Sequence, residues 1–130
     1  MNTKNIFLTL ALVLSAGQAQ AANFATFHCI DEEGVPLSIS VRGGNPRLGF
    51  LADAIQGKGA FQSHYSGEYM NSRNGVELFL VTARTAQNQY SQLYVHLETN
   101  IPAKKASGYY KATGPFGDER ISNINCGIEI

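Results

Sequence analysis

The sequence lacks several residue types and patterns that mark common functional classes. It has no tryptophan, two cysteines and four prolines in 130 residues, and only 15% of its residues are charged. The ten basic and ten acidic side chains cancel, and they are scattered along the chain. A nucleic-acid partner is therefore not expected, because phosphate binding needs a basic stripe. The absence of tryptophan also weakens an interpretation as a carbohydrate-stacking protein.

Sequence signatures of catalysis are also missing. No Gly-x-Ser-x-Gly elbow presents a serine nucleophile, and no Gly-rich loop precedes a helix to hold phosphate. A paired-carboxylate mechanism needs a fixed separation across a cleft, which sequence spacing does not supply, so we interpret the candidate acids as solvated. We expect no catalytic residue and no cofactor, and we favour a protein that is not an enzyme. The candidate acids are Asp53, Glu68, Glu77 and Glu98.

The three histidines do not form a local metal-binding motif. His28, His64 and His96 fall on three separate expected strands, and no pair has the close spacing of a zinc motif. Strand pairing could bring them together, but isolated surface histidines are far commoner. We therefore expect no metal site. His96 is the best functional candidate of the three, because its neighbours on the same strand face are tyrosines and polar residues.

Acidic residues gather near both cysteines. Asp31-Glu32-Glu33 follows the first cysteine, while Asp118-Glu119 and Glu129 flank the second. Carboxylate oxygens are calcium ligands, but the spacing fits no EF-hand loop, and surface turns are commonly acidic. We interpret these groups as solvated turns that hold no cation.

A single long apolar run lies at the start of the chain. Lys4 precedes an apolar segment over residues 6–16, and Ala19-Gln20-Ala21 forms a small-x-small cleavage site. The run is shorter than the ~20 residues that cross a bilayer. This order predicts a signal peptide over residues 1–21 and one exported domain over residues 22–130, periplasmic or secreted. No cysteine lies near the cleavage point, so no membrane anchor is expected after cleavage.

The two cysteines, Cys29 and Cys126, bracket most of the mature domain. In an exported chain a single pair of cysteines most often forms a disulfide, because the compartment is oxidising. Two buried free thiols, or half of a metal site, are the alternatives, but no second cysteine or histidine lies at ligand spacing. We therefore predict a disulfide between them.

The mature chain has the residue pattern of β-strands almost throughout. Leu37–Arg42 alternates strictly between apolar and polar residues, which predicts a half-buried strand. Val76–Thr85 is apolar on both faces, which predicts a central strand covered on both sides. Tyr90–Thr99 places its leucines and valine on one face and its tyrosines and His96 on the other. Further strands are expected at Phe24–Ile30, Arg47–Ile55, Ala60–Tyr69, Gly108–Thr113 and Ile121–Ile130.

About eight short strands in one domain predict an all-β fold, either an antiparallel barrel or a two-sheet sandwich. A Cys29–Cys126 disulfide requires neighbouring first and last strands, which favours the barrel. An outer-membrane barrel fits less well, because several segments are too short or too polar to span lipid. The long connection Asn100–Ser107 is expected to be a mobile loop. Turns are expected at Asp31–Pro36, Gly43–Pro46, Gly57–Gly59, Asn71–Gly75 and Gly114–Gly117.

Tyrosines supply the main functional indication. Tyrosine offers a large contact area and a hydroxyl group at low entropic cost, so a cluster on one face suits protein binding. Tyrosine also has high β propensity, and for any single tyrosine we favour a half-buried strand position as the explanation. The candidate binding residues are Tyr65, Tyr69, Tyr90, Tyr94, His96, Tyr109 and Tyr110.

One short segment resembles a known family. Ser66 and Gly67 match the start of the Ser-Gly-x-x-Tyr segment of c-type lysozyme inhibitors, but Met70 occupies the position of that tyrosine. Bacterial lysozyme inhibitors and lipocalin-like carriers are also small exported barrels, which is a likeness of fold alone. The match covers a handful of residues, so it carries no site over to this chain, and we assign no family.

Three functional hypotheses follow from these patterns. The first is an exported binding module, such as an inhibitor, that recognises a protein through strand faces and the loops near 65–74 and 100–110. The second is a lipocalin-like carrier of a small ligand, which requires a cavity inside a barrel. The third is a small envelope hydrolase that uses His96 or His64 with nearby carboxylates. The partner is thus an unknown protein or a small molecule.

Overall fold

The computed structural model describes residues 23–42 and 51–130. The expected signal peptide, the turn Gly43–Pro46 and the first part of the strand expected at Arg47–Ile55 lie outside the described residues. The strands are β2 (Asn23–Asp31), β3 (Pro36–Arg42), β4 (Leu51–Gln56), β5 (Ser63–Ser72), β6 (Gly75–Val81), β7 (Gln92–Asn100), β8 (Lys105–Thr113) and β9 (Glu119–Glu129). A short 3-10 turn, η1 (Gly59–Phe61), lies between the strands β4 and β5.

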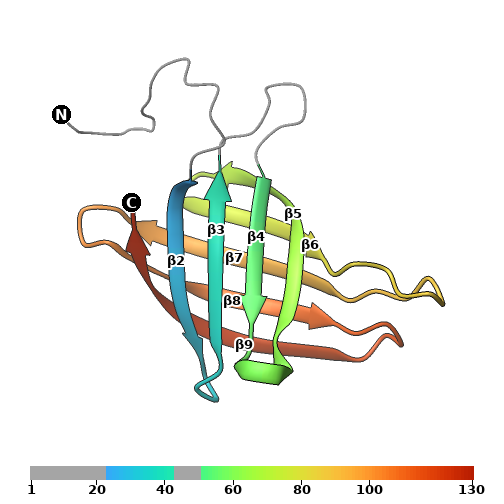
Figure 1. Ribbon diagram of the computed structural model, residues 1–130. Helices are drawn as coiled ribbons and strands as arrows, with labels where there is room; N and C mark the ends of the chain where they lie inside the picture. Colours follow the sequence, from blue (N-terminus) through green and yellow to red (C-terminus); the bar gives the residue numbers. More distant parts are fainter. Residues whose placement is uncertain (1–22, 43–50) are drawn as a thin grey trace.

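These strands close into one antiparallel barrel (Figure 1). Each strand pairs with the next along the chain, and β9 returns to pair with β2, from Thr26 opposite Glu129 to Asp31 opposite Ile124. Closure leaves no unpaired sheet edge, which removes the usual template for aggregation. The all-β prediction is confirmed, and the fold is the barrel rather than the sandwich.

The disulfide closes the barrel where its first and last strands meet. Cys29 lies directly opposite Cys126 in the β2–β9 ladder, with Cα atoms 4.0 Å and sulfur atoms 2.04 Å apart. Both side chains are buried on the inner face. The predicted disulfide is confirmed, and a bond of this kind is typical of oxidising compartments. Among the described residues, no helix is long and apolar enough to span a membrane.

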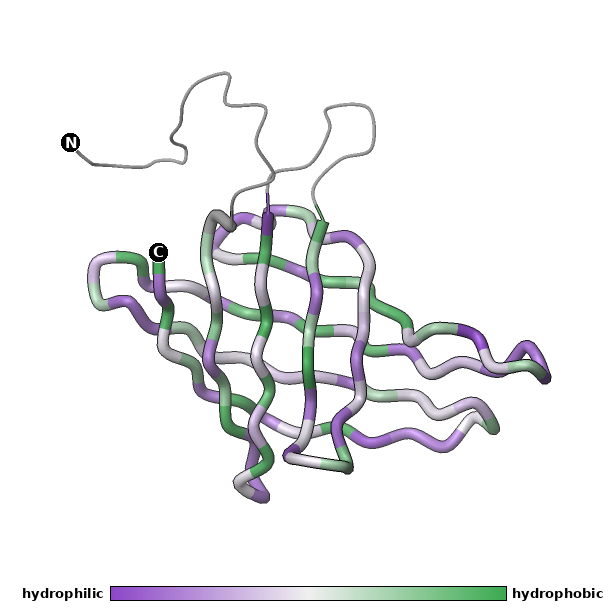
Figure 2. The backbone as a smooth tube through the Cα atoms, viewed as in Figure 1, coloured by the Kyte–Doolittle hydropathy of each residue, from purple (hydrophilic) through white to green (hydrophobic). Residues whose placement is uncertain are grey.

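The core is the filled interior of the barrel. Hydropathy alternates along several strands (Figure 2). Successive side chains of a strand point to opposite faces, and every second residue of β3, and of β7 as far as Leu97, is buried inside the barrel. The inward residues predicted on β3 and β7 are buried, including Ile39, Val95 and Leu97. Three tyrosines also point inward, and the side chain of Tyr110 is 0% exposed. Leucine, isoleucine, valine and tyrosine side chains therefore occupy the space that a carrier would leave open.

The prediction of a doubly covered strand at Val76–Thr85 is wrong. Strand β6 ends at Val81, and only its inner face is buried. Phe79 and Val81 point outward and are 50% and 42% exposed. A closed barrel has a single wall, so no second layer covers the outside of this strand. These two apolar side chains on the outer face of β6 are therefore exposed to solvent.

The prediction of a mobile loop at Asn100–Ser107 is also wrong. Strand β7 continues through Asn100 and β8 begins at Lys105, so only the short turn Ile101–Lys104 connects them. The backbone N–H of Lys104 donates to the carbonyl of Ile101 at 3.0 Å. The segment 65–74, expected to carry a second binding loop, is likewise strand up to Ser72. Paired strands therefore occupy most of both segments where loops were expected.

Glycines allow neighbouring strands to approach closely at two inward positions. A Cβ atom on Gly108 of β8 would lie 1.8 Å from the carbonyl oxygen of His96 on β7. A Cβ atom on Gly67 of β5 would lie 2.1 Å from the carbonyl oxygen of Phe79 on β6. Only glycine fits such contacts, which are typical of tight bends in barrel walls.

Candidate functional site

The structure separates the candidate tyrosines into two groups. Tyr65, Tyr69 and Tyr110 belong to the buried core, so a partner outside the barrel does not reach their rings. Burial raises the pKa of Tyr69 and Tyr110 to about 12, with the nearby Asp31 carboxylate adding to the effect on Tyr110. Tyr94 and Tyr109 point outward from β7 and β8, on the same side of the wall as His96.

Tyr90 lies apart from both groups, in the connection between β6 and β7. The guanidinium carbon of Arg84 lies 4.2 Å from the centroid of its ring. Of the seven candidate binding residues, the structure therefore brings Tyr94, His96 and Tyr109 together and leaves the other four elsewhere.

Phe79 joins these three residues to form an aromatic face, defined here as Phe79, Tyr94, His96 and Tyr109. Strand register creates it, because Phe79 lies opposite Tyr94 and His96 lies opposite Tyr109. Ring centroids are 5.3 Å apart for Phe79 and Tyr94, 6.0 Å for Tyr94 and Tyr109, and 5.6 Å for His96 and Tyr109. These separations are typical of favourable aromatic pairs. Tyr109 is 38% exposed, so the rings hold one another in place while remaining accessible.

Two carboxylates border the aromatic face. The hydroxyl of Tyr94 donates to Oε1 of Glu77 at 3.1 Å. Partial burial and this glutamate raise the pKa of Tyr94 to about 12, so the hydroxyl remains a protonated donor at neutral pH. His96 lies between the carboxylates, with Nδ1 3.8 Å from Oε2 of Glu77 and Nε2 3.7 Å from Oε2 of Glu98. The face thus combines rings, acceptors and one imidazole.

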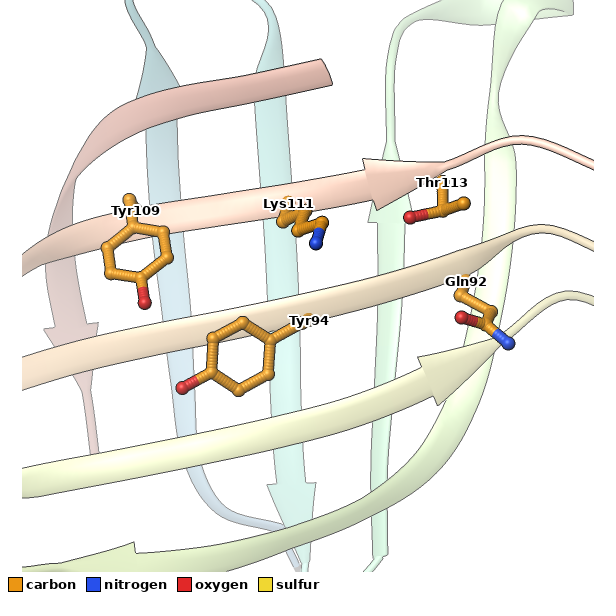
Figure 3. A pocket seen from close by; sticks show the side chains of 5 residues that line it. All are labelled: Gln92, Tyr94, Tyr109, Lys111 and Thr113. Carbon is orange, nitrogen blue, oxygen red and sulfur yellow. The ribbon is translucent and has the colours of Figure 1, made fainter. Parts of the chain in front are cut away.

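A shallow groove runs along the same side of the barrel. One depression of about 350 Å³ is lined by residues of β7 and β8 (Figure 3). A second, of about 230 Å³, continues from it through the shared residues Gln92 and Thr113. The first is lined by Gln92, Tyr94, Tyr109, Lys111 and Thr113, and the second adds Asn88, Gln89, Tyr90, Gly114 and Pro115.

Sequence reasoning missed Phe79, Lys111 and Thr113. The alternation of Tyr90–Thr99 correctly placed Tyr94 and His96 on an outer face, because polar residues mark that side of β7. Phe79 carried no such mark, since Glu77 is the one charged residue of β6 and Val81, on the same face, is apolar. Lys111 and Thr113 join the site only through the pairing of β8 with β7. Pairing partners are not visible in the sequence of either strand.

The other two histidines lie away from the aromatic face. Nε2 of His28 on β2 is 2.9 Å from Oε1 of Glu129 on β9. His64 lies on β5, opposite Ile55 of β4. Within residues 23–42 and 51–130, no group of three or more histidine, cysteine or acidic side chains is arranged to hold a metal ion. The three histidines therefore form no shared site.

Of the acidic residues near the cysteines, Asp31 and Glu33 lie around Arg120. The buried carboxylate of Asp31 accepts hydrogen bonds from the hydroxyl of Tyr110 at 2.8 Å and from Arg120 at 3.3 Å. It also accepts the backbone N–H groups of Glu33 at 2.8 Å and Val35 at 2.9 Å. Arg120 pairs with the carboxylate of Glu33 as well. These contacts join the β2–β3 turn to β8 and β9, which is a structural role.

Comparison with known proteins adds no relative. No protein-family model, curated protein or solved structure matches this chain. A proposal for its function therefore depends on the chemistry of the aromatic face and its borders.

Proposed function

We propose that this protein is an exported binding module that docks a protein partner on its aromatic face. The observation that carries the proposal is the row of ring contacts from Phe79 through Tyr94 to Tyr109 on the outside of the wall. Phe79 and Tyr109 are exposed, and Tyr94 between them is half-buried. Aromatic residues and methionine are enriched in protein interfaces. Met70, which is also exposed, lies opposite Glu77 at the border of this face. A contiguous apolar patch rimmed by polar groups is the usual mark of such an interface.

The shape of the surface favours a protein over a small ligand. Ligand pockets are concave and bury most of the ligand. The groove beside the aromatic face is shallow and open, and core side chains fill the barrel interior. A packed interior argues against the carrier hypothesis. In the described part of the chain, no serine or cysteine hydrogen bonds to His96, so the hydrolase hypothesis lacks an activated nucleophile.

Two features support export. The first 21 residues have the order of a signal peptide, with a positive start, an apolar run and a small-x-small site. The disulfide across the first and last strands suits an oxidising compartment, periplasmic or secreted.

The proposal is tested by retention of a partner from envelope and host extracts on the immobilised protein. Tyr94→Ala and Tyr109→Ala should each weaken binding by roughly 30-fold or more, because buried interface tyrosines commonly contribute about 2 kcal/mol. Phe116→Ala is the matched control, since Phe116 is 80% exposed in the β8–β9 turn, outside the aromatic face.

The test compares partner retention by the wild type and the three variants. A partner that is retained by the wild type and by Phe116→Ala, and lost by both tyrosine variants, supports the proposal. A partner retained equally by all four proteins contradicts it. Thermal unfolding of each variant confirms that the barrel is intact, since the substitutions lie outside the core.

A further inference from the structure

Three carboxylates of the described residues border the aromatic face without a lysine or arginine partner. Glu68 lies opposite Phe79, and Glu77 lies opposite His96, while Glu98 follows two residues after His96 on β7. Within the described ranges, no lysine or arginine forms an ion pair with any of these three glutamates. Lys111, a cation that lines the groove, forms its ion pair with Glu119 at 3.2 Å. The surface therefore presents negative charge next to exposed rings.

Hydrogen-bond acceptors of these carboxylates remain unused. Tyr94 occupies Oε1 of Glu77, but Oε2 lies 3.8 Å from His96, which is too long for a hydrogen bond. The contact of Glu98 with His96, at 3.7 Å, is also too long. The side chain of Glu98 is 71% exposed. Both carboxylates can thus accept N–H groups from a partner without losing an existing hydrogen bond.

The rings offer the second half of a site for a cation. A guanidinium group is attracted to the face of a tyrosine ring within about 6 Å of its centroid. This chain already contains such a pair, because Arg84 lies over the ring of Tyr90. Tyr94 and Tyr109 have no guanidinium partner among the described residues, although they lie beside the two carboxylates.

We propose that the aromatic face binds an arginine side chain of a cationic protein partner, stacked on Tyr109 and paired with Glu77 and Glu98. This inference rests on the proposed function and names the partner's chemistry. Arginine fits better than lysine, because its planar fork matches carboxylates in a bidentate way and stacks on aromatic rings. The negative border also steers a cationic partner toward the rings.

The test uses two blocked peptides, Ac-Gly-Arg-Gly-Arg-Gly-amide and its glutamate counterpart, titrated to about 10 mM against isotope-labelled protein by NMR. The arginine peptide should cause saturable shifts at Glu77, Glu98 and the ring protons of Tyr94 and Tyr109. Glu77→Gln/Glu98→Gln should weaken this binding about tenfold, because it removes both charges. Glutamine still accepts the hydroxyl of Tyr94, so the face itself stays intact.

Glu32→Gln/Glu129→Gln is the control, because it removes the same charge from exposed sites on other elements. Unchanged binding in this control supports the proposal. Equal shifts with the glutamate peptide, equal weakening in the control, or no shift at all overturns it. A partner lost on Tyr94→Ala with no response to the arginine peptide refutes this inference alone. A response to the peptide with a partner retained by the tyrosine variants refutes the proposed function instead.

Discussion

Replacing both cysteines with alanine should lower the free energy of unfolding by about 3 to 5 kcal/mol. Cys29 and Cys126 are 97 residues apart in sequence, so their bond restricts nearly the whole unfolded chain. Closing a loop of about 100 residues removes about 4.7 kcal/mol of unfolded-state entropy in the chain-entropy model. For a domain of this size the Tm should fall by more than about 10 °C. Chemical and thermal unfolding, followed by circular dichroism, measure both quantities.

The wild-type protein, reduced in denaturant and refolded with reductant present, provides the control for this variant. It loses the cross-link but keeps both sulfur atoms in the core, so its stability separates loop closure from any cavity at the alanines. We expect it to account for most of the loss. Equal stability of the oxidised and reduced proteins would show that β2 and β9 remain paired without help from the disulfide.

Asp31→Ala should lower the free energy of unfolding by about 2 to 4 kcal/mol at neutral pH. The substitution leaves the hydroxyl of Tyr110 and the N–H groups of Glu33 and Val35 without their acceptor. Each buried donor left unsatisfied costs about 1 to 3 kcal/mol, reduced where water reaches it. Asp53→Ala is the matched control, because Asp53 pairs with Arg42 on the outer wall, where an ion pair contributes about 1 kcal/mol or less. Urea unfolding compares the two variants.

Lowering the pH should remove the stabilising effect of the Asp31 carboxylate. Burial alone would raise the pKa of Asp31, but the hydrogen bonds from Val35, Tyr110 and Glu33, together with the charge of Arg120, hold it below its ordinary value of 3.8. A carboxyl group with a lowered folded-state pKa stabilises the fold above pH 3.8 and loses this effect as pH falls through the folded pKa. The difference in stability between wild type and Asp31→Ala should therefore shrink below about pH 4. A difference that stays constant from pH 7 to pH 2 would contradict this account.

The fold was predictable where residue alternation or covalent chemistry determines it. Leu37, Ile39 and Val41 alternate with polar residues, so their inward orientation could be predicted from the sequence. The two cysteines indicated that the first and last strands are neighbours. The outer face of β6 was not predictable, because Phe79 and Val81 are as apolar as the inward residues, and only barrel closure determines which side is covered.

The candidate site was predictable only in part. Tyr94 and His96 share an outer face that polar alternation marks on β7. Tyr109 and Tyr110 are adjacent in sequence and point to opposite sides of the wall, so one belongs to the aromatic face and the other to the core. Both residues are tyrosines, so residue type does not distinguish them. Their surroundings depend on the pairing of β8 with β7 and β9. Long-range register therefore decides which tyrosines are available to a partner.

Hydroxyl-radical footprinting of the protein, free and bound to the partner it retains, tests the docking surface most directly. The aromatic face should lose oxidation in the complex at Phe79, Tyr94 and Tyr109. Phe61 and Phe116, which are exposed in turns outside this face, should be oxidised equally in both states. Protection of Phe61 or Phe116 with unchanged oxidation of Phe79 and Tyr109 would contradict docking on the outer face of β6, β7 and β8.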